Sequence, residues 1–239
     1  MRVAFISDIH GNAVALRAVL DDIRSTGCDK VYVLGDICYR GPDPKACLEM
    51  VQDAAFDVLK GNADEWVVTG IQPGQVPEDR FVMMSAERQF TVSELTTGDI
   101  EYLDRLPMTL CDRSDGIEWF AFHATPHDLF PVLEETADEQ AVKREVFAAH
   151  DANVFLYGHI HLPYVRQIGE RTLLNLGSVG LPFDGVPQAS YAVVDFHRAR
   201  VDINLRRVPY DVDAAVRRLQ EVDYPNVPYL TRLLREARP

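Results

Sequence analysis

The sequence has no long hydrophobic run and few basic residues. No stretch approaches the roughly 20 apolar residues of a membrane helix, and the apolar run that begins at Val3 ends at Ile6, far short of a secretory signal. Lys and Arg number only 24 against 37 Asp and Glu, which gives a formal net charge of −13. The lack of a long apolar run argues against a membrane partner. Because affinity for a nucleic-acid backbone depends on Lys and Arg, we also expect no stable nucleic-acid binding.

Cysteine is also scarce, and its spacing is irregular. The four cysteines form neither a CxxC pair nor a zinc-finger pattern: Cys28, Cys38, Cys47 and Cys111. This spacing argues against a disulfide framework and against a cysteine-based zinc site. We therefore expect reduced thiols and a cytoplasmic protein.

Apolar residues, in contrast, make up 47% of the chain, which predicts a globular fold. The 239 residues suffice for one large domain with a substantial core. The acidic balance would repel an anionic substrate, so any phosphate site needs local positive charge. Bound metal ions are one source of such charge.

Strands and helices alternate in the first part of the chain. Apolar runs predict strands at residues 2–7, 31–34 and 56–59, with helices at 13–23 and 44–51 between them. Asn12 is a suitable N-cap for the first helix, and Gly27 is suited to end it. A β-α-β-α-β order predicts a parallel sheet with right-handed crossovers.

The remaining elements complete the predicted fold. Residues 63–106 are expected to form a helical insertion or cap, broken at 70–74. Two further apolar strands are predicted at 117–122 and 153–157, with a helix near 138–149 between them. Four short strands of an antiparallel sheet are predicted at 165–168, 172–174, 191–195 and 201–205. Two helices, at 212–219 and 230–237, are predicted to follow them. We predict an α/β (α+β sandwich) fold, with two packed mixed β-sheets flanked by helices, as a single domain over residues 1–239.

Side chains that can bind metal follow five of the predicted strands. The blocks are Asp8-Ile9-His10-Gly11-Asn12, Gly35-Asp36, Gly61-Asn62-Ala63-Asp64, His123 and Gly158-His159-Ile160-His161. Open α/β sheets place their ligand sites outside the carboxyl ends of the strands. Carboxylate and amide oxygens and imidazole nitrogens are all metal ligands. The sequence therefore predicts a metal site at the carboxyl ends of these strands.

The number of candidate ligands indicates two ions. The seven candidates are Asp8, His10, Asp36, Asn62, His123, His159 and His161. A zinc-like ion takes about four ligands, so seven suit two divalent ions about 3.5–4 Å apart that share a carboxylate. Mixed nitrogen and oxygen ligands suit Mn²⁺ first, with Fe, Zn, Ni or Co as alternatives.

This ordered set resembles the calcineurin-like metallophosphoesterase superfamily. The family pattern is D-x-H, G-D, G-N-x-D/E, a lone H and G-H-x-H, and all five blocks occur in order between residues 8 and 161. The chain length and the Gly177-Ser178 turn are similar to the small prokaryotic phosphodiesterase branch. The resemblance implies that residues 1–239 form a metallophosphoesterase domain.

The resemblance also implies a role for each ligand. Asp8, His10 and His161 would hold the first metal, Asn62, His123 and His159 the second, and Asp36 would bridge them. A hydroxide shared by the two ions would attack phosphorus in line. By the same resemblance Asp36, Asn62 and His123 serve catalysis as well as metal binding.

Arg40 is a further catalytic candidate. The segment from Gly35 to Gly41 resembles the G-D-x-x-x-R-G of the phosphoprotein phosphatase branch, whose Arg binds the substrate phosphate. A guanidinium suits bidentate phosphate binding. The alternative is an exposed loop residue paired with Asp43.

One position departs from the family pattern. Many members carry a His general acid directly after the metal-binding Asn, where this chain has Ala63. Alanine cannot transfer a proton, so small nucleotide-like phosphodiesters or phosphoanhydrides with stable leaving groups are favoured as substrates. His127 is either a substitute acid or an exposed loop residue.

Other functions remain open. A dinucleoside polyphosphate hydrolase or a phosphoprotein phosphatase would use the same centre. A non-catalytic metal-binding scaffold or regulatory protein would keep the site without turnover. An exposed strand edge could also pair two copies into a homo-oligomer.

Overall fold

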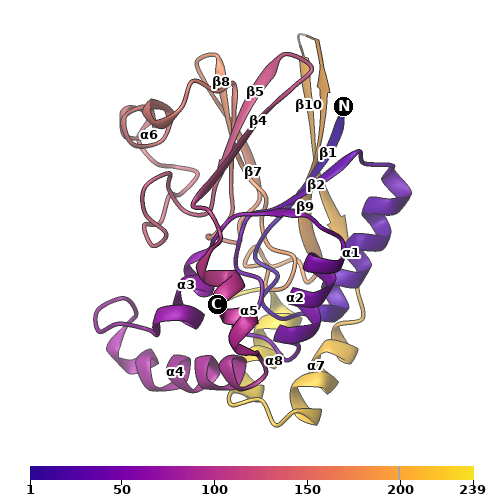
Figure 1. The fold of residues 1–239 in the computed structure, drawn as a ribbon, viewed down its shortest axis with the longest axis vertical. Helices are drawn as coiled ribbons and strands as arrows, with labels where there is room; N and C mark the ends of the chain where they lie inside the picture. The colour runs from indigo at the N-terminus through magenta and orange to yellow at the C-terminus, as the bar shows by residue number, and fades with distance from the viewer. Residues whose placement is uncertain (199) are drawn as a thin grey trace.

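The computed structural model describes residues 1–198 and 200–239 and contains two five-stranded sheets that pack face to face (Figure 1). The first sheet has the order β10 (Arg200–Val208), β9 (Ala189–His197), β1 (Arg2–Ile6), β2 (Lys30–Val33) and β3 (Asp57–Val58). The second has the order β4 (Thr109–Ser114), β5 (Ile117–Phe122), β6 (Val154–Tyr157), β8 (Arg171–Asn175) and β7 (Tyr164–Ile168). Each sheet combines parallel and antiparallel pairs, which confirms the predicted fold class.

The β-α-β-α-β unit predicted from the amino-terminal part is present. β1 pairs with β2 and β2 with β3, both in parallel. Between them run α1 (Ala13–Thr26) and α2 (Pro44–Asp53). Asn12 caps α1 by accepting the N–H of Ala15, and Gly27 ends it in the left-handed conformation. The local capping signals therefore place the helix boundaries correctly.

Packing on both faces explains why strands such as β1 are continuous apolar runs in the sequence. In β1, Val3 and Phe5 face the second sheet, while Ala4 and Ile6 face the helices on the other side. The ring of Phe5 lies 5.1 Å from that of Trp119 in β5, edge to face. Both faces of these strands are buried, so polar and apolar residues do not alternate.

Helices gather beyond one end of the sheets (Figure 1). The segment predicted to be helical holds α3 (Asn62–Thr69), α4 (Glu78–Ser93) and α5 (Thr97–Asp104). The carboxyl-terminal pair α7 (Val212–Glu221) and α8 (Val227–Glu236) lies at the same end. Phe90 of α4 packs at 5.0 Å against Tyr224, between α7 and α8, so the two groups of helices touch.

A single helix, α6 (Glu139–Glu145), and a 3₁₀ turn at Phe147–Ala149 cover the outer face of the second sheet. The apolar partners include Val142, Phe147 and Phe155. Among the described residues, every helix is too short or too polar to span a bilayer.

One prediction about the strands is wrong, and one strand was not predicted. The four late strands do not form one antiparallel sheet: the β7–β8 hairpin extends the second sheet, where β8 runs parallel to β6, and the β9–β10 hairpin completes the first, where β9 pairs with β1. Turn signals report the hairpins but not the sheet that each one joins. β4 was not predicted because Cys111, Asp112 and Arg113 lack strand patterning, yet β4 pairs along all of β5.

Candidate metal centre

The seven candidate ligands meet beyond the carboxyl ends of five strands. Asp8 and His10 follow β1, Asp36 follows β2, Asn62 follows β3, His123 follows β5, and His159 and His161 follow β6. Six of the seven side chains are buried, and His159 is half-buried. The two sheets thus contribute ligands from both sides of the interface between them.

One group of side chains comes from the first and last blocks of the motif. Asp8, His10 and His161 offer ligand atoms within 4.8 Å of one another. The Nε2 atoms of His10 and His161 are 3.1 Å apart, and His161 Nε2 lies 3.1 Å from Asp8 Oδ1. These three side chains are arranged around one small space.

A second group lies beside the first. Asn62 Oδ1 is 2.9 Å from His123 Nε2 and 2.8 Å from His159 Nδ1. Asp36 lies between the groups, since its Oδ2 atom is 3.6 Å from His10 Nε2 and 3.4 Å from His123 Nε2. A carboxylate in this position can contact a cation in either group.

Backbone carbonyls fix the orientation of the imidazole rings. His10 Nδ1 lies 2.8 Å from the carbonyl of Tyr39, and His123 Nδ1 lies 2.7 Å from that of Leu34. His161 Nδ1 contacts the carbonyl of Leu181 at 2.5 Å. A carbonyl can only accept, so each Nδ1 donates and each Nε2 is turned toward the centre as a potential ligand.

The atoms that face the centre fit cations. The two Nε2 atoms of His10 and His161 can share at most one proton, whereas a cation satisfies both lone pairs. Asp8 Oδ1 is buried without a hydrogen-bond partner among the described residues. A buried unpaired carboxylate oxygen is costly, and a divalent ion would satisfy it. The donor set therefore fits divalent metal ions in both groups.

The electrostatics of the centre follow from burial and close contact. Burial alone would raise the pKa of Asp8, but the adjacent His161 and His10 hold this pKa well below its usual range. Burial opposes a charged His123, yet the carboxylate of Asp36 raises the pKa of His123 to about 10. A metal ion would displace that proton when it binds, so acid pH should weaken binding.

Most of the candidate ligands have a strained backbone. Asp8, His10, Asp36, His159 and His161 have φ values of 56°, 49°, 58°, 68° and 59°, in the left-handed region. That region costs a non-glycine residue roughly 1–2 kcal/mol. Such strain persists only where the surroundings impose it, and it clusters at functional sites.

Close packing of the loops leaves room only for glycine at several points, and two of these lie beside candidate ligands. An added Cβ at Gly61 would overlap the carboxylate of Asp36, and one at Gly158 would overlap that of Asp8. Each glycine therefore lets a neighbouring loop approach a candidate ligand.

Asp64 supports the centre in a role that the sequence did not reveal. Its buried carboxylate accepts the backbone N–H groups of Asp36, Ile37 and Gly61 at 2.8, 3.0 and 2.9 Å. It thereby ties the loop after β2 to the loop after β3. The Gly61-Asn62-Ala63-Asp64 block marks the position of Asp64 in the sequence, but it does not show which groups Asp64 contacts.

The structure places Arg40 away from Asp43, so the predicted alternative pairing is wrong. Asp43 pairs with Arg218 of α7 at 2.8 Å. Arg40 instead lies 3.5 Å from the buried carboxylate of Glu87 in α4, and its guanidinium lies 5.5 Å from the ring of Tyr229 in α8.

The two positions considered for a general acid differ in their surroundings. Ala63 is buried, and its backbone N–H donates to Asp36 Oδ1 at 2.8 Å. His127 is exposed on the loop after β5.

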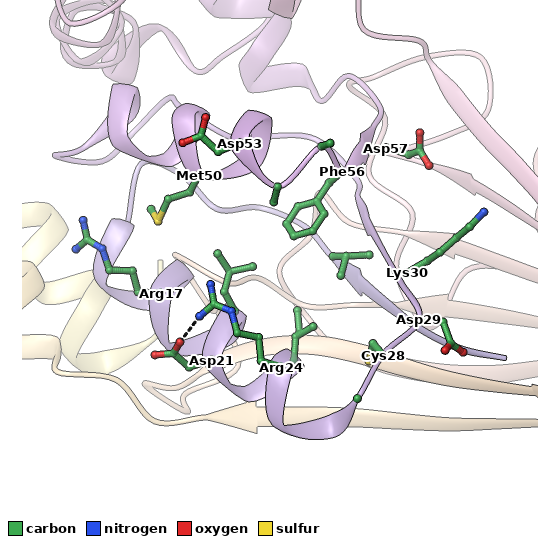
Figure 2. A pocket seen from close by; sticks show the side chains of 16 residues that line it. Arg17, Asp21, Arg24, Cys28, Asp29, Lys30, Met50, Asp53, Phe56 and Asp57 are labelled. Atoms are coloured by element: carbon green, nitrogen blue, oxygen red, sulfur yellow. Dashed lines mark hydrogen bonds and ion pairs between the residues drawn. The ribbon is translucent and has the colours of Figure 1, made fainter.

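A surface groove of about 950 Å³ lies at the other end of the first sheet. Figure 2 shows side chains of α1, including Arg17 and Arg24, opposite Met50 and Asp53 of α2. The groove also borders Lys30 and Asp57, the first residues of β2 and β3, and none of the seven candidate ligands lines it. It is therefore separate from the centre at the carboxyl ends.

Comparison with known proteins agrees with this geometry. The profile described as "Calcineurin-like phosphoesterase superfamily domain" matches residues 1–199. The chain belongs to this superfamily. Membership confirms the predicted family, makes the chain a metal-dependent phosphoesterase and accounts for the candidate ligand groups.

Individual relatives cover most of the chain. The uncharacterized protein MJ0912 of Methanocaldococcus jannaschii is 31% identical over 91% of both chains. The phosphodiesterase YfcE of Escherichia coli is 27% identical over 82% of this chain and 88% of its own length. A crystal structure of a metallophosphoesterase from Sphaerobacter thermophilus covers 99% of both chains with a TM-score of 0.79 and 28% identity. These matches support the small prokaryotic branch of the superfamily.

Proposed function

We propose that this phosphoesterase uses two divalent metal ions, Mn²⁺ first, to hydrolyse phosphodiester or phosphoanhydride bonds in small nucleotide-like molecules. The observation that carries the proposal is the position of Asp36 Oδ2, 3.6 Å from His10 Nε2 and 3.4 Å from His123 Nε2. A carboxylate oxygen between two groups of ligand atoms suits a bridge between two ions.

Each group of side chains would hold one ion. Asp8, His10 and His161 suit the first ion, Asn62, His123 and His159 suit the second, and Asp36 suits both. When bound, such ions activate water near neutral pH and neutralise charge on the phosphoryl oxygens. The chain itself supplies the fixed geometry: carbonyl-bound imidazoles, the Asp64 anchor and a strained backbone that holds the ligands in place before metal binds.

Arg40 is the proposed phosphate-binding residue. Its side chain is only 16% exposed, yet its buried Nε has no hydrogen-bond partner among the described residues. A largely buried guanidinium has five N–H donors to satisfy, and phosphate oxygens match its planar arrangement. A cavity of about 120 Å³ lies beside Arg40, lined also by Asp79, Arg80, Met83, Met84, Glu87, Asn226 and Tyr229. We propose that α4 and α8 form a cap that selects the substrate there.

Replacement of Arg40 tests this role. Arg40→Lys keeps the charge but loses the planar donors, so we expect KM for a phosphodiester to rise about tenfold, which is about 1.4 kcal/mol. Steady-state kinetics measure the effect. Arg218→Lys, at an arginine that binds Asp43 instead, should leave KM unchanged. An equal rise in both variants would remove Arg40 from substrate binding.

The missing acid at Ala63 favours diesters with good leaving groups, and the phosphodiesterase activity named for the Escherichia coli relative supports a diester substrate. We expect hydrolysis of bis(p-nitrophenyl) phosphate with added Mn²⁺, and rates that fall steeply as the pKa of the leaving group rises. A positioned general acid is worth about 10²–10⁴-fold, mainly for poor leaving groups.

A series of aryl and alkyl phosphodiesters measures this dependence. Equal rates across the series would show that another group protonates the leaving oxygen. His127→Ala then identifies or eliminates the exposed His127 as that group. No hydrolysis of any phosphoester with any divalent metal would overturn the proposed function and favour a scaffold.

Location and assembly complete the proposal. All four cysteines are free thiols, which suits a reducing cytoplasm. β7 is an edge strand of the second sheet, and its Val165 is 46% exposed. An edge of this kind suits pairing with a second copy of the chain.

A further inference from the structure

A buried serine outside the ligand set connects two of the proposed ligands. Ser178 lies in the loop between β8 and β9 and is fully buried. Its hydroxyl donates to the backbone carbonyl of Asp8 at 2.7 Å and accepts the N–H of Leu181 at 2.8 Å. The carbonyl of Leu181 in turn accepts from His161 Nδ1. One hydroxyl therefore joins Asp8 to His161 through a single intervening residue.

The surrounding loop reinforces this connection. The N–H of Gly180 donates to the same carbonyl of Asp8 at 2.9 Å. The side chain of Asn12 donates to the carbonyl of Gly180 at 3.1 Å. An added Cβ at Gly180 would overlap the carbonyl of Ile9, so the loop packs directly on the first ligand block.

Strain explains why the connection matters. Asp8 and His161 both have a left-handed backbone, with φ values of 56° and 59°. Neither conformation is favourable by itself, so contacts around these residues must hold them. The Ser178 hydroxyl holds Asp8 directly and orients the ring of His161 through Leu181.

The other group of ligands is held by different contacts. His123 Nδ1 lies against the carbonyl of Leu34, and His159 Nε2 lies 3.3 Å from that of Phe130. The serine hydroxyl contacts neither of these carbonyls, because its bonds go to Asp8 and Leu181. Asp8 Oδ2 also accepts the backbone N–H of His159 at 3.0 Å, but that bond is made by the Asp8 side chain and not by the carbonyl that Ser178 holds. Loss of the hydroxyl should therefore act directly on the first group.

We propose that Ser178 is a positioning residue for the first metal ion: its hydroxyl fixes Asp8 and His161 relative to each other. This inference rests on the proposed two-metal function. It distinguishes the two halves of the centre, because the hydrogen bonds of the Ser178 hydroxyl go to Asp8 and to Leu181, which holds His161.

Metal binding by Ser178→Ala tests the inference. Calorimetric titration of metal-free protein with Mn²⁺ should show one ion bound about 10- to 100-fold more weakly than in the wild type, the usual cost of losing an outer-shell partner. The other ion should bind as in the wild type, which also shows that the variant is folded. Electron paramagnetic resonance at one equivalent of Mn²⁺ should show an isolated ion and no coupled pair.

Ser190→Ala is the matched control. Ser190 is equally buried, and its hydroxyl donates to the carbonyl of Leu176 at 2.8 Å, away from the ligands. We expect wild-type affinity for both ions. The inference fails if Ser178→Ala binds both ions normally, or if both variants weaken both ions equally, while the proposed function stands. A wild-type protein that binds no ion would overturn the proposed function together with this inference.

Discussion

Asp36→Asn lowers the rate of hydrolysis of bis(p-nitrophenyl) phosphate by about 10³-fold at saturating Mn²⁺, and this is the largest effect we expect from a single substitution. Asp36 Oδ2 lies within 3.6 Å of both His10 Nε2 and His123 Nε2, so in the proposed centre this oxygen would contact both ions. The neutral amide loses the bridging charge, and a loss of about 4 kcal/mol of transition-state stabilisation corresponds to this factor. Steady-state assays over a range of Mn²⁺ concentrations measure it.

Asp57→Asn is the matched control for the charge change. Asp57 is exposed at the start of β3, at the opposite end of the first sheet from the centre. The control should retain the wild-type rate. If Asp36→Asn kept more than about a tenth of the wild-type rate, a bridging role for this carboxylate would be wrong.

Removal of metal ions lowers the melting temperature by about 10 °C or more. An ion that binds only the folded chain adds about 2.7 kcal/mol at a hundred times its Kd, and two ions add about twice that. For a chain of this size 1 kcal/mol corresponds to about 2–4 °C. The strained ligands and the buried Asp8 Oδ1, which has no hydrogen-bond partner among the described residues, make the metal-free centre costly to hold. Differential scanning calorimetry with EDTA or with excess Mn²⁺ measures the difference.

Two variants show whether the effect comes from this centre. His123→Ala combined with His161→Ala removes one ligand from each group and should abolish the stabilisation by Mn²⁺. His197→Ala, at an exposed His on β9, should retain it. If Mn²⁺ raised the melting temperature of the double variant as much as that of the wild type, the ions would stabilise the protein by binding elsewhere.

The sequence predicted the strands that carry ligands because their signals are local. β6 is buried throughout, and β1 and β2 are apolar after a basic first residue and buried at their carboxyl ends. Each of the three is followed by a turn with glycine and a candidate ligand. The late hairpins were assigned to the wrong arrangement because a turn fixes only its own two strands. Whether β8 then pairs with β6 depends on packing that no local pattern encodes.

The candidate ligands were predictable and their supports were not, for a related reason. Residue type and the order of the motif blocks are enough to select Asp8 or His161 as a candidate ligand from the sequence. The bond from Ser178 to Asp8 joins residues 170 positions apart, and that from Asp36 to Asp64 joins residues 28 apart. Left-handed φ values at non-glycine residues leave no mark in the sequence either. Contacts of this kind appear only once both sheets are in place.

Anomalous diffraction from Mn²⁺-loaded crystals tests the two-metal centre most directly. We expect two peaks about 3.5–4 Å apart, one among Asp8, His10 and His161 and the other among Asn62, His123 and His159, with Asp36 between them. A single peak, or peaks away from these residues, in protein that hydrolyses the diester would contradict the account.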